Sequence, residues 1–385
     1  MRSTARYSRL TRYRVAIAAT GAATLTAVMA YGASLPAQAA HRVTQRHICG
    51  ITAAVHLHGR TYHVQRYGMF GIVPVKGHRH MPMNRPIMAK CGTRAAPAAS
   101  SGKLAYGGGP LELHPQVFLD FFGSQWGNDA NGVVQYMTNF FKGVGVQPQD
   151  NWSTIMTQYT DGNGNAPSFN GSVLGGVWMD NSQPSPQAAS ANQLAAEAQA
   201  AAQHFGVSGP DVDIFVLSPT GTQPAGFNTP GGGFCAFHDF NGDTAWTNLP
   251  YVLDLGSGCG ANAVQSQLDG FSIAGGHEYA EAVTDPEPGS GYVASDGSEI
   301  GDLCAFQNLF ALQLTSGSFA MQPLWSNQAN GCAQSGNSGN GGSGNTGNTG
   351  GTGSTGGTGN TGGTGNTGGS GSTGGTGNSG GTGNS

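Results

Sequence analysis

The chain has 385 residues and a formal net charge of −4, and only 9% of its residues are charged while 66 are glycine. The charge is unevenly distributed: ten Lys or Arg and no acid lie between residues 41 and 103, whereas all twenty acids and a single base, Lys142, follow residue 104. A body with one base offers no surface for phosphates, which excludes nucleic acid as its partner.

The first segment, residues 1–39, has the pattern of a secretory signal peptide. Five arginines precede an apolar run, and Ala37-Gln38-Ala39 supplies the small residues of a cleavage site. No later segment is apolar enough to span a bilayer. We therefore expect a secreted, extracellular protein with no membrane contact after signal removal.

Residues 40–103 form a basic segment with seven histidines. Its charge is opposite to that of the body, which predicts a propeptide held on a zymogen until processing. The alternative is an independent module that binds polyanions of the cell wall or cell surface.

The acidic body, residues 104–335, alternates strand and helix patterns. Extended segments are predicted at 116–122, 153–160, 172–180, 211–221, 231–240, 248–256 and 309–319, and helices at 132–142, 186–205 and 272–285. Ser185 is expected to cap the second helix and Gly206 to end it. The order of these elements is that of a zincin: a mixed sheet, a backing helix, an edge strand at 231–240 and then a short acidic helix. We predict an α+β fold with a zincin-like mixed sheet, braced by disulfides. Residues 336–385, a Gly/Thr/Asn/Ser repeat, are predicted to be a disordered tail.

All six cysteines follow the cleavage site, and an even number in an exported chain predicts disulfides. Fifteen pairings are open, of which pairing between sequence neighbours is the simplest: Cys49–Cys91, Cys235–Cys259 and Cys304–Cys332. The last pair would brace the loop that follows the acidic helix.

The highest density of side chains that can act as catalysts or metal ligands lies between residues 272 and 304, where one histidine and seven carboxylates fall within 33 residues. A helix here places His277 and Glu281 one turn apart on one face, with Glu278 beside them. Zinc-peptidase helices hold Zn²⁺ through two residues at this spacing, and the adjacent glutamate activates water as a general base. Either Glu299 or Asp302 is expected to supply the third ligand.

Two other interpretations use the same acids. One is a metal-free hydrolase of peptide or glycan at low pH, in which two carboxyls work as an acid–base pair. The other is a non-catalytic, wall-associated protein whose acids hold a structural Ca²⁺.

A second calcium interpretation concerns Asp239, Asn241 and Asp243, although a turn rich in Asn and Asp explains their spacing better. His238, next to them, is interpreted as structural, with polarisation of a substrate carbonyl as the alternative.

Several segments, taken together, resemble secreted bacterial proteins akin to the plant phosphate-induced, EXORDIUM-like family: YGGGPLELHPQVFLDFFGSQW, GGVWMDNS, NLPYVLDLGSGCGAN and GHEYAEAVTDP followed by EIGDLC. The resemblance covers about residues 106–332 and implies an extracellular protein tied to cell-wall growth. The GHEYAE segment also resembles metallopeptidase helices such as those of metzincins. That resemblance maps His277 and Glu281 to the helix ligands and Glu278 to the general base, with Glu281 standing where metzincins have a second histidine. The sequence thus predicts a secreted, zinc-dependent peptidase that acts on polypeptides.

Overall fold

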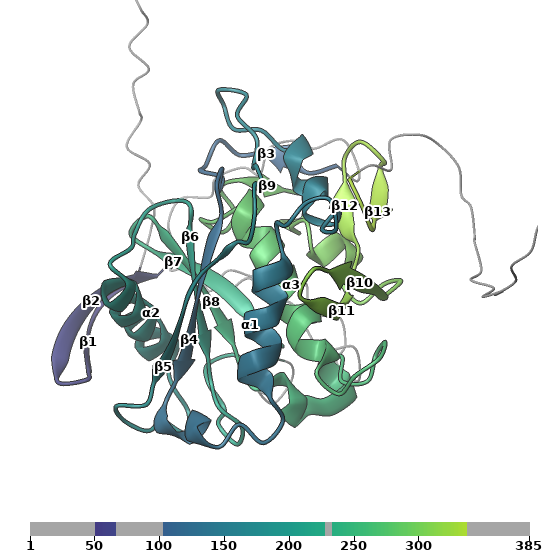
Figure 1. Cartoon of the computed structure of the whole chain (residues 1–385). Coiled ribbons are helices and arrows are strands. Elements are labelled where there is room, and N and C mark those ends of the chain that lie inside the picture. Colours follow the sequence, from purple (N-terminus) through teal and green to yellow (C-terminus); the bar gives the residue numbers. More distant parts are fainter. Residues whose placement is uncertain (1–50, 67–102, 228–232, 337–385) are drawn as a thin grey trace, which may run out of the picture. The chain divides into compact units, whose positions relative to one another are not determined.

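A computed structural model describes residues 51–66, 103–227 and 233–336 (Figure 1). The predicted signal peptide, the repeat tail, the Cys49–Cys91 pair and most of the basic segment lie outside the described residues. All described residues belong to one unit of the chain, residues 49–385.

A five-stranded mixed sheet in the order β5-β4-β6-β8-β7 forms the centre of the body (Figure 1). Four strands run parallel, namely β4 (Gln116–Phe122), β5 (Leu174–Asp180), β6 (Val212–Leu217) and β8 (Thr244–Leu249). The edge strand β7 (Phe237–Asn241) pairs antiparallel with β8. The α+β class and the edge position of this strand are confirmed, whereas the sequence pattern does not predict β8.

Helices cover both faces of the sheet, so the strands are apolar on both sides. α1 (Val133–Gly143) and α3 (Asp269–Thr284) share one core, and α2 (Ala191–Phe205) belongs to a second core. Neighbouring residues of β6 show the division, because Phe215 joins the core of α1 and α3 while Ile214 joins that of α2. The side of the sheet that a strand residue faces therefore decides which of the two helical layers it meets.

The segment 153–160, predicted to be extended, forms a 3-10 helix instead, η2 (Ser153–Gln158). Asp150 accepts hydrogen bonds from the backbone N–H of Ser153 at 3.1 Å and from its hydroxyl, which caps the turn. Ile155 and Met156 are buried while Thr157 is exposed, a helical rather than an alternating pattern. Local capping thus overrides the β-propensity of the segment.

The prediction for 248–256 is also wrong beyond its first two residues. β8 ends at Leu249, Pro250 cannot extend a central strand, and the 3-10 helix η3 (Val252–Cys259) follows.

α2 begins five residues later than predicted, because Ser190 rather than Ser185 is its N-cap. The Ser190 hydroxyl accepts from the backbone N–H of Gln193, and the Gln193 side chain accepts from the backbone N–H of Ser190, forming a capping box. Gly206 ends the helix in a left-handed conformation, as expected.

Small antiparallel pairs complete the fold. They are β3 (Ala105–Tyr106) with β9 (Tyr292–Val293), β10 (Phe310–Leu314) with β11 (Gly317–Met321), and β12 (Leu324–Ser326) with β13 (Gly331–Ala333). From the basic segment, β1 (Ile51–Leu57) and β2 (Arg60–Arg66) form a hairpin, which the sequence analysis does not anticipate. A short 3-10 helix, η1 (Ser124–Gly127), follows β4.

Two of the three predicted disulfides are confirmed, Cys235–Cys259 and Cys304–Cys332. Across the ranges that the structure covers, none of the helices combines the length and the apolar character that a membrane span needs.

Candidate active site

The helix α3 is the central element of the site. All sixteen of its residues are buried, so it lies inside the body rather than on its surface. Gly276 permits this packing, because a Cβ there would collide with Cε of Met321 on β11. The helix ends at Thr284, just before Asp285 and Pro286, as the sequence predicts. The acids of α3 are therefore held in the interior by their own helix.

The predicted ligand pair on α3 meets as expected. Nε2 of His277 lies 2.9 Å from Oε1 of Glu281, at a spacing of one helical turn. Oδ1 of Asp302 lies 3.7 Å from the same nitrogen, and the backbone N–H of Asp302 donates to Oε1 of Glu281 at 3.1 Å. Of the two residues predicted as third ligand, Asp302 therefore accompanies His277.

His238 enters the site from the edge strand β7. Its Nδ1 lies 3.2 Å from Oε2 of Glu278 and 3.7 Å from Oε2 of Glu281. Its Nε2 lies 3.3 Å from the backbone oxygen of Asp285 and 3.6 Å from Oε1 of Glu299. His238 is thus an integral member of the acidic cluster, whereas sequence reasoning interprets it as structural.

Glu281 connects two overlapping groups that could each hold a metal ion. One group is His277, Glu278 and Glu281, and the other is His238, Glu281 and Glu299; within each, ligand atoms lie within 4.8 Å of one another. The side chains of both histidines and of all three glutamates are completely buried. The side chains singled out by the HExxE spacing therefore lie together in three dimensions.

The carboxyl groups strongly affect the two imidazoles. Burial alone would lower the pKa of His277. The negative charges of Glu281, Glu278 and Asp302 outweigh this effect and raise the pKa to about 10. Burial likewise lowers the pKa of His238, and the hydrogen bond to Glu278 with the surrounding acids raises it to about 9. The negative charge around both rings therefore favours their protonated form.

Burial has the opposite effect on the acids, because it raises the pKa of a carboxyl group. Burial raises the pKa of Glu299 and of Asp302 well above their ordinary values, and repulsion from Glu281 adds to it. Five carboxyl groups and two imidazoles are buried together here: Glu278, Glu281, Asp285, Glu299, Asp302, His238 and His277. Such an excess of buried acid requires bound protons or a cation.

Several polar atoms of the cluster accept or donate no hydrogen bond within the described part of the chain. They are both ring nitrogens of His277, Oε2 of Glu281, both carboxyl oxygens of Glu299 and Oδ1 of Asp302. The 2.9 Å contact of His277 with Glu281 has the length of an ion pair but not the direction of a hydrogen bond. Because buried polar atoms are nearly always satisfied, imidazole and carboxylate atoms of this kind fit a bound divalent metal.

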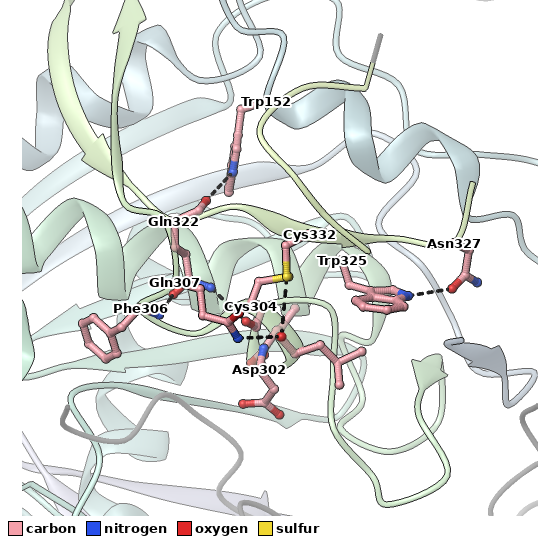
Figure 2. Close-up of a disulfide and its surroundings, with 12 residues drawn as sticks. Trp152, Asp302, Cys304, Phe306, Gln307, Gln322, Trp325, Asn327 and Cys332 are labelled. Carbon is pink, nitrogen blue, oxygen red and sulfur yellow. Dashed lines mark hydrogen bonds between the residues drawn. A yellow bond between two sulfur atoms is a disulfide. The ribbon is translucent and has the colours of Figure 1, made fainter. Parts of the chain in front are cut away.

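The loop that carries Asp302 is braced from several sides (Figure 2). Asp302 begins the short helix η4 (Asp302–Cys304), whose last residue is bonded to Cys332 of β13. The side-chain N–H of Gln322 donates to the backbone oxygen of Gly301 at 2.9 Å. The predicted disulfide therefore supports the loop that carries Asp302.

The sequence pattern assigns no role to two of the acids at the site, Asp285 within the cluster and Asp213 beside it. Asp285 accepts backbone N–H groups from the loop after α3, at 2.6 Å from Gly289 and 2.9 Å from Ser290. Asp213 of β6 accepts from the Thr247 hydroxyl at 3.2 Å. Burial raises the pKa of Asp213 to about 7, against the lowering effect of the His238 charge. The position of Asp213 in a segment predicted to be an extended, apolar strand, an unusual place for a carboxylate, is the signal in the sequence that points to it.

The segment proposed as a calcium loop lies in the β7–β8 hairpin. Asp239 and Asn241 belong to β7, and Oδ1 of Asn241 accepts from the backbone N–H of Gln65 at 3.1 Å. Asp243 follows Gly242, which has a φ of 74°, in the turn. These residues therefore lie in an edge strand and the tight turn that follows it, as the turn interpretation expects.

Comparisons with known proteins give no match: no family model, no curated protein and no solved structure is similar to this chain. The resemblance to the EXORDIUM-like family therefore stays a prediction. The site is defined by its geometry alone.

Proposed function

We propose that this protein is a secreted, metal-dependent peptidase whose zinc is held by His277, Glu281 and Asp302. The observation that supports the proposal is that Nε2 of His277 lies 2.9 Å from Oε1 of Glu281 and 3.7 Å from Oδ1 of Asp302, while this nitrogen, Oε2 of Glu281 and Oδ1 of Asp302 lack hydrogen-bond partners among the described residues. One imidazole and two carboxylates form an acceptable zinc ligand set. Bound zinc would supply a Lewis acid for the scissile carbonyl and for water.

Glu278 is the proposed general base. It lies next to His277 on α3, and burial raises its pKa, which shifts it toward the neutral range where a base is most effective. His238 donates to Oε2 of Glu278 at 3.2 Å and to the backbone oxygen of Asp285 at 3.3 Å, so it acts as a positioning residue in its protonated form. Glu278 takes a proton from water and returns it to the leaving amine.

The fold supports a polypeptide as the substrate. β7, which carries His238, is the antiparallel edge of the sheet, and an extended peptide could pair with such an edge once the segments that bury β7 in the full chain are displaced. A mixed sheet with this edge strand beside α3 is the arrangement that we propose to be zincin-like. The extracellular setting is supported by the two disulfides.

The complete burial of the cluster bears on activation. His277, Glu278 and Glu281 are all inaccessible to solvent in the full chain, which still carries the basic segment 40–103. We propose that this segment is a propeptide and that its removal precedes activity.

A second candidate function is a metal-free acid hydrolase. It is supported by Glu299 and Asp302, since burial raises the pKa of both well above the ordinary range and each can act as a proton donor. The burial of the cluster is also compatible with a structural calcium ion in a non-catalytic wall-associated protein. Chelation separates the three functions: it abolishes zinc peptidase activity, leaves the acid hydrolase active, and only destabilises a non-catalytic calcium protein.

The test combines metal content with activity. Zinc would be measured by elemental mass spectrometry in the wild-type chain and in His277→Ala, Glu281→Ala and Glu278→Gln, with His114→Ala as a control histidine outside the cluster. We expect the first two variants to lose one equivalent of zinc and Glu278→Gln to retain it. In a peptide-cleavage assay on the processed protein, Glu278→Gln should lower kcat/KM by about 100-fold or more. Zinc content unchanged in His277→Ala and Glu281→Ala, or calcium that survives both, would sink the zinc mechanism.

A further inference from the structure

The hairpin of β1 and β2 packs against the body through α2. Val55, Tyr62 and Val64 of the hairpin are buried in the same apolar core as α2. The turn at its tip is formed by His58 and Gly59, with φ values of 50° and 72°. His58 therefore stands at the end of a rigid hairpin, and its ring packs edge-on against Phe122 of β4 at 6.1 Å between centroids.

The imidazole of His58 meets two carboxylates of the body. Its Nε2 lies 2.6 Å from Oε2 of Glu197 on α2 and 3.1 Å from Oδ2 of Asp180 at the end of β5. The side chain of His58 is 16% exposed, against 3% for Asp180 and 0% for Glu197. Behind them lies Asp120 of β4, also fully buried. Burial raises the pKa of Asp120 and of Glu197, and the nearby charge of Glu197 raises that of Asp120 further. Two carboxyls thus contact His58, and a third lies behind Glu197.

These acids are incompletely satisfied. In the described ranges, both carboxyl oxygens of Asp120 and Oε1 of Glu197 receive no donated hydrogen bond. The ion pairs of Asp180 and Glu197 in those ranges involve His58 and no lysine or arginine. With a protonated His58 as their one cationic partner among the described residues, the three buried acids require either bound protons or an additional cation.

The hydrogen bond made by Nδ1 of His58 determines whether Nε2 carries a proton or a free lone pair. Nδ1 lies 3.3 Å from the hydroxyl of Ser182. When Nδ1–H donates to this hydroxyl, Nε2 keeps its lone pair and faces the two carboxylates as an acceptor. Three acceptor atoms then converge within 4.8 Å of one another, which is the spacing of a metal site.

A path for an ion is present at the same place. A cavity of about 330 Å³ opens beside the cluster and is lined by His58, Asp180, Ser182, Trp178 and His204, among others. The rings of Trp178 and His204 stack at 4.2 Å and form one wall. The cluster is therefore reachable from solvent through a preformed opening.

We propose that His58, Asp180 and Glu197 form a second divalent-cation site, separate from the cluster on α3, which ties the N-terminal hairpin to the body. One imidazole with two carboxylates is a ligand set that suits Zn²⁺. Asp120 orients Glu197 from behind. Two ligands come from the body and one from the hairpin, so the ion joins the basic segment to the acidic body.

The experiment titrates the metal-free full chain with Zn²⁺ alone and measures stoichiometry, affinity and thermal midpoint. The variants are His58→Gln, His277→Ala, and as a matched control His56→Gln, an exposed histidine on the same hairpin. We expect the wild type and His56→Gln to bind one more equivalent of Zn²⁺ than His58→Gln, or to bind it at least tenfold more tightly. Zn²⁺ should also slow trypsin cleavage at Arg60 in the wild type but not in His58→Gln.

Unchanged Zn²⁺ binding in His58→Gln overturns the proposal and leaves a direct hydrogen bond between a protonated His58 and Glu197. Should His58→Gln fail to fold, Asp180→Asn tests the same site with the hairpin intact, and unchanged binding there has the same meaning. The two sites are told apart by His277→Ala. If that variant keeps its zinc while His58→Gln loses an equivalent, the proposed peptidase mechanism fails and the hairpin site stands.

Discussion

Gly301 lies directly against the imidazole of His277, since a Cβ on Gly301 would stand 2.7 Å from Nδ1 of that ring. The backbone of Gly301 has ordinary right-handed helical angles, with φ of −78° and ψ of −42°, so glycine is required here for space rather than for conformation. The glycine lets the loop that carries Asp302 approach the α3 ligands.

Gly301→Ala should therefore push the loop or the ring out of place. We expect the free energy of unfolding to fall by about 1 to 3 kcal/mol through overpacking, together with weaker zinc binding. Denaturant unfolding and a zinc titration measure the two effects. Gly127→Ala is the matched control, because a Cβ at Gly127 meets nothing within 4 Å. Normal zinc affinity in Gly301→Ala would contradict the role of this contact.

The two predicted third ligands can be separated by isosteric substitutions. Oδ1 of Asp302 is 3.7 Å from Nε2 of His277, whereas Oε1 of Glu299 lies 3.6 Å from Nε2 of His238. We expect Asp302→Asn to weaken zinc binding at the α3 cluster by about tenfold or more, since loss of a ligand should cost at least as much as loss of a group that supports one. Glu299→Gln should have a smaller effect. Competition with a chromogenic chelator gives both affinities, and the reverse order would assign the third position to Glu299.

Removal of the Cys304–Cys332 disulfide should affect both stability and the site. The bond closes a loop of 28 residues, and its loss through a double serine substitution is expected to cost about 3 kcal/mol. Because Asp302 begins the helix that ends at Cys304, zinc affinity should fall as well. The Cys235–Cys259 bond closes 24 residues in a loop that does not contain Asp302, so its removal is the comparison for the stability loss. Undiminished zinc affinity after loss of Cys304–Cys332 would show that the loop holds its shape without the bond.

Glu112 should make stability depend on pH. Burial, followed by repulsion from Asp213 and Asp211, raises the pKa of Glu112 well above its unfolded value of 4.5. Between these two pKa values the folded chain binds a proton that the unfolded chain does not. The contribution of Glu112 to stability therefore falls as pH rises from 4.5 through the folded pKa.

Glu112→Gln removes this ionisation. We expect the variant to be more stable than the wild type at pH 7 to 8, by about 1 to 3 kcal/mol, and to show a flatter pH profile. Chemical denaturation at several pH values measures both curves. Parallel curves for the two proteins would mean that Glu112 finds a partner when it ionises.

Sequence reasoning identifies what is local. The pairing of His277 with Glu281 follows from the helical repeat, and Pro286 sets the end of α3, so both could be predicted. The Cys304–Cys332 bond follows from neighbour pairing. In these cases the information lies within a few residues or in one simple rule.

The remaining features depend on contacts between distant segments. His238 and Glu278 are 40 residues apart, and only the antiparallel pairing of β7 with β8 brings the ring onto α3. The preference of Asp302 over Glu299 for His277 depends on the path of a loop. The contact between His58 and Glu197 could not be predicted, because the two residues are 139 positions apart in the sequence. Contacts between segments so far apart leave no periodic pattern in the sequence from which they could be predicted.

The burial of α3 on every side has a consequence for how the protein assembles. The helix cannot be enclosed by the sheet, α1 and β11 while its carboxylates still carry water and unbalanced charge. Closing of the core and neutralisation of the site are thus a single event, completed only when protons or an ion have been taken up. We therefore expect the amide hydrogens of α3 to gain protection from exchange when the site is occupied, and to report its occupancy more directly than those of any surface element.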